Sequence, residues 1–306
     1  MTTASSSGSR PRRRPAASVF KAIPLIARGF SLLSPGLAAR LFAYLFTRPM
    51  RQKLPRHERE WLLQSSGRPL RLASGSLLPL YEWRSSRLAA GVRDEAPLPT
   101  ILLVHGFGGR AGQMGGFAAP LVAAGYRVVS FDAPAHGAAA GTRSSLPEML
   151  EVTKEVADRL GPLAGVVAHS NGASAVIAAL AQGLRADRVA LLAPMPDLES
   201  YISRLATQIG FSQQVAVLAQ DRVERRFDLP FGALKGSTLA AQLSQPALIL
   251  QDSADKIVPL SEVETLAAAW PGAELLVTAG LGHNRLLRDA GAIAAVAAYF
   301  GAPTLR

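Results

Sequence analysis

The feature that constrains the fold most is an alternation of short apolar runs with helical segments between residues 100 and 300. The runs are rich in Val, Leu and Ile, and a stretch with helical periodicity follows each of them. Strands that are apolar throughout are buried on both faces, as in parallel sheets covered by helices. Because crossovers between parallel strands are right-handed, the pattern predicts a doubly wound α/β domain with a mostly parallel sheet. The predicted strands are 100–106, 126–134, 163–170, 187–194, 246–252 and 273–280.

The connections between these strands add detail to the predicted domain. An edge hairpin is expected at residues 69–86, ahead of the parallel strands. Ser145 and Glu148 have the spacing of a capping box with Pro147 in the first turn, which predicts a helix that begins there. About fifty residues, 195–245, separate two strands and have helical periodicity of their own. We expect them to form a small helical insertion in the α/β domain.

Positive charge is concentrated at the N-terminal end of the chain. Residues 1–57 hold eleven Lys and Arg and no Asp or Glu, whereas the rest of the 306-residue chain has 22 basic and 22 acidic residues. We therefore divide the chain into a basic N-terminal arm, 1–68, and an α/β domain, 69–306. The first 18 residues have a composition typical of disordered segments, and an amphipathic helical segment follows them.

Three interpretations of the arm stay open. It is a helical arm packed on the domain, an interfacial helix on anionic membrane, or a transit peptide. No apolar run in it reaches the roughly 18 residues of a membrane-spanning helix. It has no nucleic-acid recognition motif, so we expect no nucleic-acid partner. The chain has no cysteine, which is compatible with a reducing compartment, and we predict a cytoplasmic protein. The second interpretation adds peripheral contact with the membrane.

A serine lies where a functional site is expected. In α/β sheets, sites form beyond the carboxyl ends of the strands. Ser170 lies there, between an apolar run and an alanine-rich helical segment, and its neighbours two positions away are Ala168 and Gly172. Small residues at those positions permit a sharp turn that exposes the hydroxyl at a helix N-terminus. The pattern predicts a nucleophilic serine.

Such a serine needs a base, and the base needs a group that orients it. In a strand–turn–helix setting the chain order is serine, then an acid, then histidine. His283 is the only histidine after Ser170. The acid before it is Asp252 or Asp255, and the residues by themselves leave both open.

Five short motifs give the chain a family resemblance. They are HGFGG (105–109), DAPAHG (132–137), AHSNGA (168–173), DSADKIVP (252–259) and GLGH (280–283). In this order they resemble the serine hydrolases of the α/β-hydrolase fold, of the esterase and lipase-like kind, over about residues 69–301. One departure is Ala168, which stands where the family's G-x-S-x-G motif has its first glycine. The serine differs from the aspartate nucleophile of the dehalogenases and epoxide hydrolases of this fold.

The resemblance implies a role for each site residue. Ser170 attacks an acyl carbonyl, and His283 takes its proton and returns it to the leaving group. Asp255 orients the imidazole, because the family's acid precedes a segment that matches residues 256–259. The backbone N–H groups of Phe107 and Asn171 form the oxyanion hole. The insertion at 195–245 resembles the family's cap, whose apolar residues line a substrate cavity or pack the cap onto the domain.

The other histidines near the predicted strand ends are expected to have structural roles. His105 is expected to brace the oxyanion loop and His136 to support a turn, while His169 is expected to point away from Ser170. The glycine pairs do not match a phosphate-binding motif, and the histidines lack metal-ligand spacing. We therefore expect no cofactor and no metal.

The predicted function is that of a serine hydrolase, which cleaves a small-molecule carboxylic ester through an acyl-enzyme intermediate. A thioesterase or an acyltransferase would use the same triad. A non-catalytic protein of this fold that binds a membrane surface or a partner is the alternative from another class.

Overall fold

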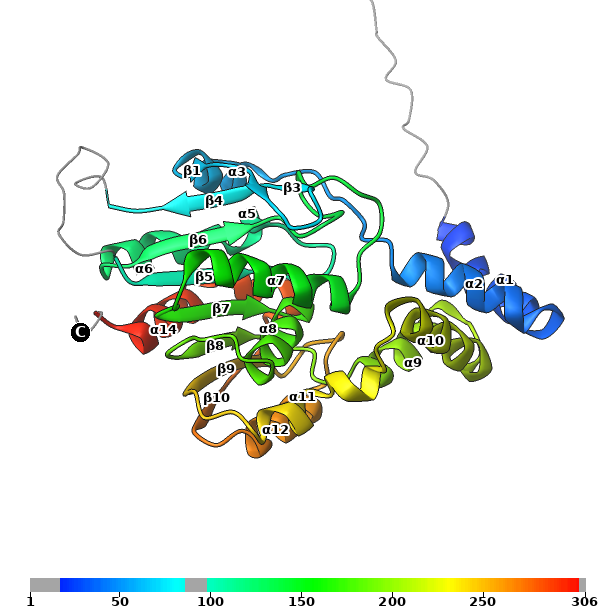
Figure 1. Cartoon of the computed structure of the whole chain (residues 1–306). Coiled ribbons are helices and arrows are strands. Elements are labelled where there is room, and N and C mark those ends of the chain that lie inside the picture. Colours follow the sequence, from blue (N-terminus) through cyan, green and yellow to red (C-terminus); the bar gives the residue numbers. More distant parts are fainter. Residues whose placement is uncertain (1–16, 86–97, 303–306) are drawn as a thin grey trace, which may run out of the picture.

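A mostly parallel sheet forms the centre of the protein, as predicted (Figure 1). The computed structural model describes residues 17–85 and 98–302. The strands of the main sheet are β1 (Ser66–Gly67), β4 (Leu80–Trp83), β5 (Thr100–Val104), β6 (Arg127–Phe131), β7 (Gly165–His169), β8 (Val189–Leu192), β9 (Ala247–Asp252) and β10 (Ala273–Thr278). Within the described residues their order is β1-β4-β6-β5-β7-β8-β9-β10. All neighbours from β6 to β10 are parallel, and β4 and β1 add an antiparallel edge.

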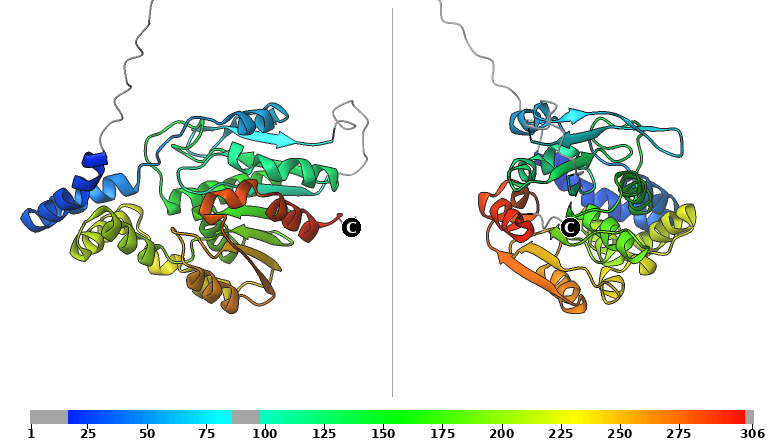
Figure 2. Two further views of the ribbon diagram at one scale, coloured as in Figure 1. Left: turned by 180° about the vertical axis from the view of Figure 1, so that it is seen from behind. Right: turned by 60° about the vertical axis from the view of Figure 1, so that its left-hand side comes forward.

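Both faces of the sheet are covered by helices, which explains the continuous apolar runs. Ile101 and Leu103 belong to one core and Leu102 and Val104 to the other, and all four are fully buried. Figure 2 shows the two helical layers from behind and from the side. The first layer contains α7 (Leu146–Leu160), α8 (Asn171–Ala181), α11 (Gly236–Ala240) and α12 (Leu260–Ala269). The second contains α3 (Arg56–Leu63), α5 (Ala111–Met114), η1 (Gly115–Phe117), α6 (Ala118–Ala123) and α14 (Ala290–Phe300).

Local capping decides where two of the helices begin. The Ser145 hydroxyl accepts a hydrogen bond from the Glu148 N–H at 3.3 Å and donates one to the Glu148 carboxylate at 3.1 Å, which confirms the predicted capping box. The Asp289 carboxylate caps α14 through the Ala292 N–H at 2.9 Å. This cap separates α14 from α13 (Gly282–Arg285) and η3 (Leu286–Arg288), which precede it in the chain.

The predicted edge hairpin at 69–86 is divided between two sheets. Strands β2 (Leu70–Arg71) and β3 (Leu77–Leu78) form a separate two-stranded sheet, while β4 joins the main sheet. Strand β1 also belongs to the main sheet and begins before residue 69, where the sequence analysis placed the domain boundary.

The segment between β8 and β9 forms helices that project beyond the carboxyl ends of the strands (Figure 1). They are α9 (Leu198–Ile209), α10 (Gln213–Phe227) and η2 (Phe231–Leu234), followed by α11. We call α9, α10 and η2 the cap. Ile202 of α9 and Phe211, in the turn between α9 and α10, are buried in the core that the cap shares with the first helical layer.

Two N-terminal helices, α1 (Ala17–Leu33) and α2 (Pro35–Phe46), lie against the cap (Figure 1). Phe42 of α2 packs on Phe211 between α9 and α10, with ring centroids 5.3 Å apart. Beyond α2, the Thr47 carbonyl accepts the Ser144 N–H at 2.8 Å. The guanidinium of Arg51 donates to the Gly141 carbonyl at 3.1 Å. The start of the arm, up to residue 16, lies outside the described residues. None of the helices in the described parts of the chain is both long and apolar enough to cross a membrane.

Candidate active site

Ser170 occupies a strained turn between β7 and α8. Its φ of 52° lies in the left-handed region, which residues other than glycine rarely adopt. Neighbouring backbone approaches the turn closely. A Cβ atom on Gly172 would overlap the carbonyl oxygen of His105, and one on Gly106 would come within 2.9 Å of the Ser170 Cβ. The glycines therefore allow the loop after β5 to lie against the turn, with the serine hydroxyl on the carboxyl edge of the sheet.

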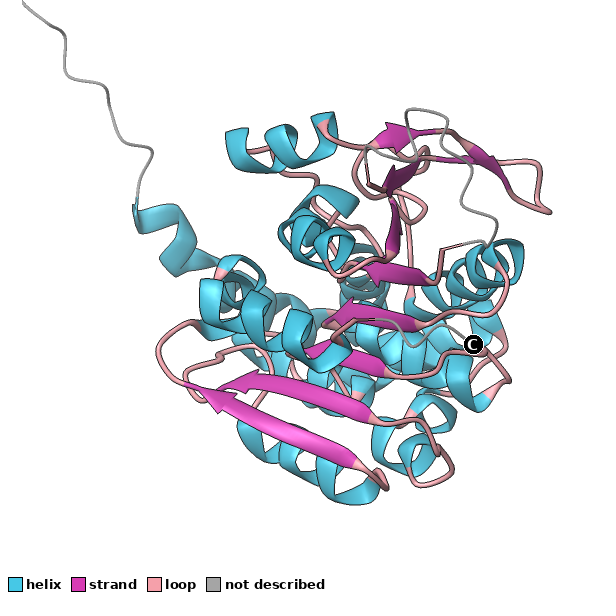
Figure 3. Cartoon of the chain, turned by 90° about the vertical axis from the view of Figure 1, so that its left-hand side faces the viewer, coloured by secondary structure: helices cyan, strands magenta, loops and turns pink. Residues whose placement is uncertain are grey.

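The structure brings Ser170, His283 and Asp255 together in one hydrogen-bonded chain. The Ser170 Oγ lies 2.9 Å from the His283 Nε2, and the His283 Nδ1 lies 2.7 Å from the Asp255 Oδ2. The side chain of His283 is 8% exposed and that of Asp255 is fully buried. The three residues follow β7, β9 and β10, whose carboxyl ends share one edge of the sheet (Figure 3). This arrangement provides a base next to the hydroxyl and an acid that orients the base.

Asp252 does not contact the histidine side chain. Its carboxylate accepts hydrogen bonds from the Leu281 N–H at 2.9 Å and the Gly282 N–H at 2.8 Å, directly before His283. It also accepts the Thr278 hydroxyl and the Ala254 N–H. Burial opposes ionisation of Asp252, but these donors outweigh it and lower its pKa to about 2. Asp252 therefore holds the loop that presents His283.

The carboxylate of Asp255 is held in place by the loop after β9. Its Oδ1 accepts the N–H groups of Ile257 at 2.7 Å and Val258 at 3.1 Å. Burial opposes its ionisation, but His283 and these N–H groups lower its pKa below the ordinary value. Gln251, fully buried on β9, donates to the Asp255 Oδ2 at 3.3 Å and to the Val258 carbonyl at 2.9 Å. Asp255 is thus an ionised acceptor with a fixed orientation toward His283.

Three further histidines surround the site in the neutral form. His105 accepts the Ala133 N–H through Nε2 at 3.0 Å and donates from Nδ1 to the Gly106 carbonyl at 2.8 Å, so it braces the loop after β5. Burial lowers the pKa of His105 to about 4. Burial likewise lowers the pKa of His136 and of His169 to about 3, with a neighbouring histidine adding to the effect in both cases. All three imidazoles are therefore uncharged at neutral pH.

His169 lies beside His283, which the sequence analysis did not foresee. Their ring centroids are 4.8 Å apart, and the His169 Nε2 lies 3.1 Å from the His283 carbonyl oxygen. A neutral imidazole can donate this hydrogen bond. The only signal in the sequence was the position of His169 next to Ser170, and that position does not define the direction of the ring. Gln251 was missed in the same way, since it looks like part of a buried strand.

Two backbone N–H groups at the site, those of Phe107 and Asn171, have no hydrogen-bond acceptor among the described residues. Phe107 and Asn171 line the same cavity as Ser170. Within the described part of the chain, neither of their N–H groups donates a hydrogen bond to the protein. Asn171 is the first residue of α8, where N–H groups have no partner in the helix and the helix dipole favours negative charge.

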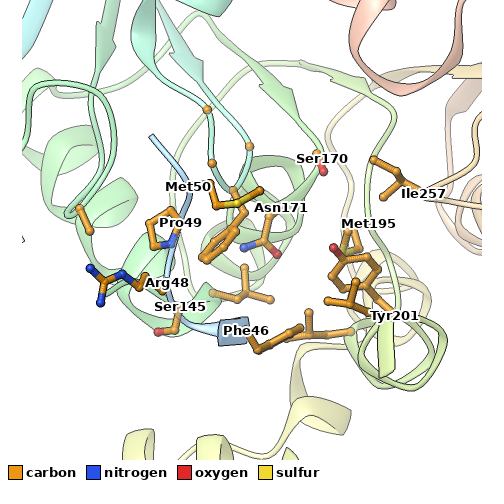
Figure 4. A pocket seen from close by; sticks show the side chains of 18 of the residues that line it. Phe46, Arg48, Pro49, Met50, Ser145, Ser170, Asn171, Met195, Tyr201 and Ile257 are labelled. Atoms are coloured by element: carbon orange, nitrogen blue, oxygen red, sulfur yellow. The ribbon is translucent and has the colours of Figure 1, made fainter. Parts of the chain in front are cut away.

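A cavity of about 1020 Å³ opens above Ser170 (Figure 4). Its lining comes from the end of α2 and the residues after it, the loop after β5, the segment from β6 into α7, and the turn at Ser170. The cap, the loop that leads into it, and the loops after β9 and β10 complete the lining. In Figure 4, Phe46 and Tyr201 lie on the far side of the cavity from Ser170. The apolar lining residues include Phe46, Leu146, Met195, Leu198, Tyr201 and Phe231. Cap residues were expected in the lining of the cavity from the sequence, but residues of the arm were not.

A sequence profile described as the alpha/beta hydrolase family matches residues 101–296, which is more than half of the chain. The chain belongs to the alpha/beta hydrolase family. No curated protein matches the sequence of this hydrolase significantly.

Solved structures share the fold of this hydrolase at low sequence identity. The esterase Pf2001 of Pyrococcus furiosus is 18% identical with a TM-score of 0.60, over 83% of this chain and 96% of that one. A bacterial membrane phospholipase A is 16% identical with a TM-score of 0.57, over 89% and 94% of the two chains. The thioesterase domain of the curacin biosynthetic pathway is 19% identical with a TM-score of 0.54, over 77% and 98%. The main sheet and its helical layers are therefore those of an alpha/beta hydrolase.

Proposed function

We propose that this hydrolase cleaves carboxylic esters through an acyl-enzyme formed on Ser170. The observation that supports the proposal most directly is the chain of hydrogen bonds from Asp255 through His283 to Ser170. It ends at the floor of a cavity with apolar walls. The arrangement contains each group that acyl transfer by a serine needs.

The proposed reaction has two matched halves. The Ser170 Oγ attacks the acyl carbon while its proton passes to the His283 Nε2, and the carbonyl oxygen becomes an oxyanion facing the N–H groups of Phe107 and Asn171. The bond to the leaving alcohol then breaks, and the alcohol takes the proton from Nε2. A water molecule repeats the sequence on the acyl-enzyme, which releases the acid and restores the serine. Asp255 stabilises the imidazolium in both halves.

The apolar lining of the cavity supports a substrate whose apolar acyl group is bound there. A cavity of about 1020 Å³ lies at the upper end of the range for small-molecule sites. Its far wall is formed by the aromatic rings of Phe46, Tyr201 and Phe231. The burial of each methylene there contributes about 0.8 kcal/mol, so affinity should rise with chain length until the cavity is filled.

Hydrolysis of p-nitrophenyl esters from acetyl to long acyl tests the proposal. We expect turnover by the wild type and a loss of at least about 10³-fold in Ser170→Ala, because no other group attacks the acyl carbon. Ser253→Ala is the matched control, since this serine is exposed near the site. Equal rates in Ser170→Ala and the wild type would contradict the proposal. A folded wild type that is inactive on all the esters and on matched thioesters would favour a non-catalytic protein.

A further inference from the structure

The side of α1 and α2 that faces away from the cap is apolar and exposed. On α1, Leu32 is 84% exposed and Leu33 is 87% exposed. Residues seven and eight positions apart lie on one side of a helix, so these leucines share a side with the exposed residues near position 25. On α2, Leu37 and Leu41 are four positions apart and therefore also share one side of their helix. We call this surface the outer face; its members are Leu25, Ile26, Leu32, Leu33, Leu37 and Leu41.

The inner sides of both helices lie on the same support. The Ser31 hydroxyl of α1 accepts the Ser212 N–H at 3.3 Å, and Phe42 of α2 stacks on Phe211. Phe211 and Ser212 are neighbours in the turn between α9 and α10. Since both helices are held from below by one turn, their opposite sides point outward together. Figures 1 and 2 show the two helices as the outermost layer at this end of the molecule.

Positive charge borders the outer face. Arg28 on α1 and Arg40 on α2 are exposed, each beside the apolar residues of its helix. The sequence has no Asp or Glu before Glu58, so α1 and α2 themselves contribute no negative charge to this border. An apolar helix face with basic flanks fits the interface of an anionic bilayer, where the leucines enter the acyl boundary and the cations meet the headgroups. A second copy of this chain fits less well, because a two-fold contact would bring together two outer faces whose own helices carry charge of the same sign.

The outer face continues to the mouth of the cavity. Leu45, one helical turn beyond Leu41, lines the cavity and is 46% exposed. Met50 also lines it and is 79% exposed, and Arg48 is a further lining residue; Figure 4 labels Arg48 and Met50 at the cavity. A membrane in contact with the outer face would therefore lie next to the entrance of the site.

We propose that α1 and α2 dock this hydrolase on anionic phospholipid membranes, with the cavity mouth toward the lipid, so that its substrates are acyl esters held in the membrane. The substrate part of the proposal rests on the proposed function, whereas the docking part does not. Arg28 and Arg40 attract the anionic headgroups, and the apolar residues of the outer face enter the acyl region.

Vesicle flotation of the full chain tests the docking. The protein carries Ser170→Ala, so that it cannot alter the lipid. Vesicles are made from phosphatidylcholine alone or from equal parts of phosphatidylglycerol and phosphatidylcholine. We expect binding to the anionic vesicles and a loss of at least about tenfold with Leu32→Asp/Leu33→Asp, which places charge in the acyl boundary. Arg28→Gln/Arg40→Gln should weaken binding about 25-fold, at about fivefold for each cation. Leu63→Asp is the control, because Leu63 is 78% exposed on α3.

A second assay separates docking from catalysis. With Ser170 restored, Leu32→Asp/Leu33→Asp should hydrolyse a soluble short-chain ester like the wild type, but cleave a long-chain ester in anionic vesicles at least about tenfold more slowly. A wild type that binds the vesicles but cleaves neither ester would overturn the proposed function and leave the docking intact. Docking is wrong if the Ser170→Ala protein does not float with anionic vesicles or if Leu63→Asp loses as much binding. It is also wrong if sedimentation shows a dimer that Leu32→Asp/Leu33→Asp dissociates, because the outer face then binds a second copy.

Discussion

At the residue scale, Asp252, the last residue of β9, and Asp255, three positions later, contact different groups. Asp255 contacts the imidazole of His283, while Asp252 accepts a hydrogen bond from the backbone N–H of Gly282, the residue directly before His283. The first contact acts on the protonation of the base and the second on its position. Substitutions at the two sites should therefore affect different measured quantities.

We expect Asp255→Asn to lower kcat by about 10⁴-fold, because an amide in the place of the acid favours the wrong imidazole tautomer. Asp252→Asn should instead lower the free energy of unfolding by about 2 kcal/mol, which corresponds to the fall of the Asp252 pKa to about 2. Steady-state kinetics and urea denaturation of both variants check this. If Asp252→Asn lowered kcat more than Asp255→Asn, and the two variants were equally stable, the roles would be exchanged. Asp252 would then act on the protonation of His283, and Asp255 on its position.

At the scale of elements, the arm and the cap form one wall of the cavity together. Phe46, the last residue of α2, lies with its ring 6.1 Å from that of Tyr201 on α9 and 6.3 Å from that of Phe231 on η2. Residues 101–296, which match the family, do not include α2. The far end of the cavity thus depends on an element that lies outside the matched region.

Phe46→Ala should reduce the preference for long over short acyl esters about tenfold, which corresponds to about 1.4 kcal/mol of lost apolar contact. Turnover of the acetyl ester should stay within about twofold of the wild type, because a short acyl group does not reach this wall. The ratio of kcat/KM values across the p-nitrophenyl ester series is the measurement. Leu41→Ala, on the exposed side of the same helix, is the control. An equal loss on all chain lengths would mean that Phe46 supports the fold and not the acyl group.

At the scale of the whole molecule, buried neutral histidines make stability depend on pH. The pKa values of His105, His136 and His169 are lowered by burial to about 4, 3 and 3 in the folded protein. An unfolded histidine binds its proton below about pH 6.5. Between these values the unfolded state holds more protons than the folded state, so stability falls as the pH falls.

We predict full stability above about pH 6.5 and a loss of up to about 4 kcal/mol per pH unit between pH 6 and 4. Urea denaturation at a series of pH values measures this slope. His136→Asn removes one of the three groups and should make the slope shallower by about 1.4 kcal/mol per pH unit. Stability that is unchanged from pH 7 to 4 would show that these histidines are protonated in the folded protein.

The mostly parallel sheet and the sharp turn at Ser170 could be predicted from the sequence alone. These features follow from local patterns, namely apolar runs, caps and small residues, which act over a few neighbouring positions. The order of the motifs also pointed to His283, because only one histidine follows the serine. The family and the fold are confirmed, whereas the catalytic roles of Ser170, Asp255 and His283 stay a prediction.

Which side chains contact each other could not be predicted before the fold was known. The sequence around the end of β9 left both Asp252 and Asp255 open as the acid. The direction of each carboxylate depends on the loop that follows β10. The ring of His169 and the place of Phe46 depend in the same way on elements far away in the chain. Periodicity reports which side of an element is buried but not which element buries it. The sequence was therefore enough to recognise the arm as amphipathic. That it packs on the cap and lines the cavity could be seen only in the structure.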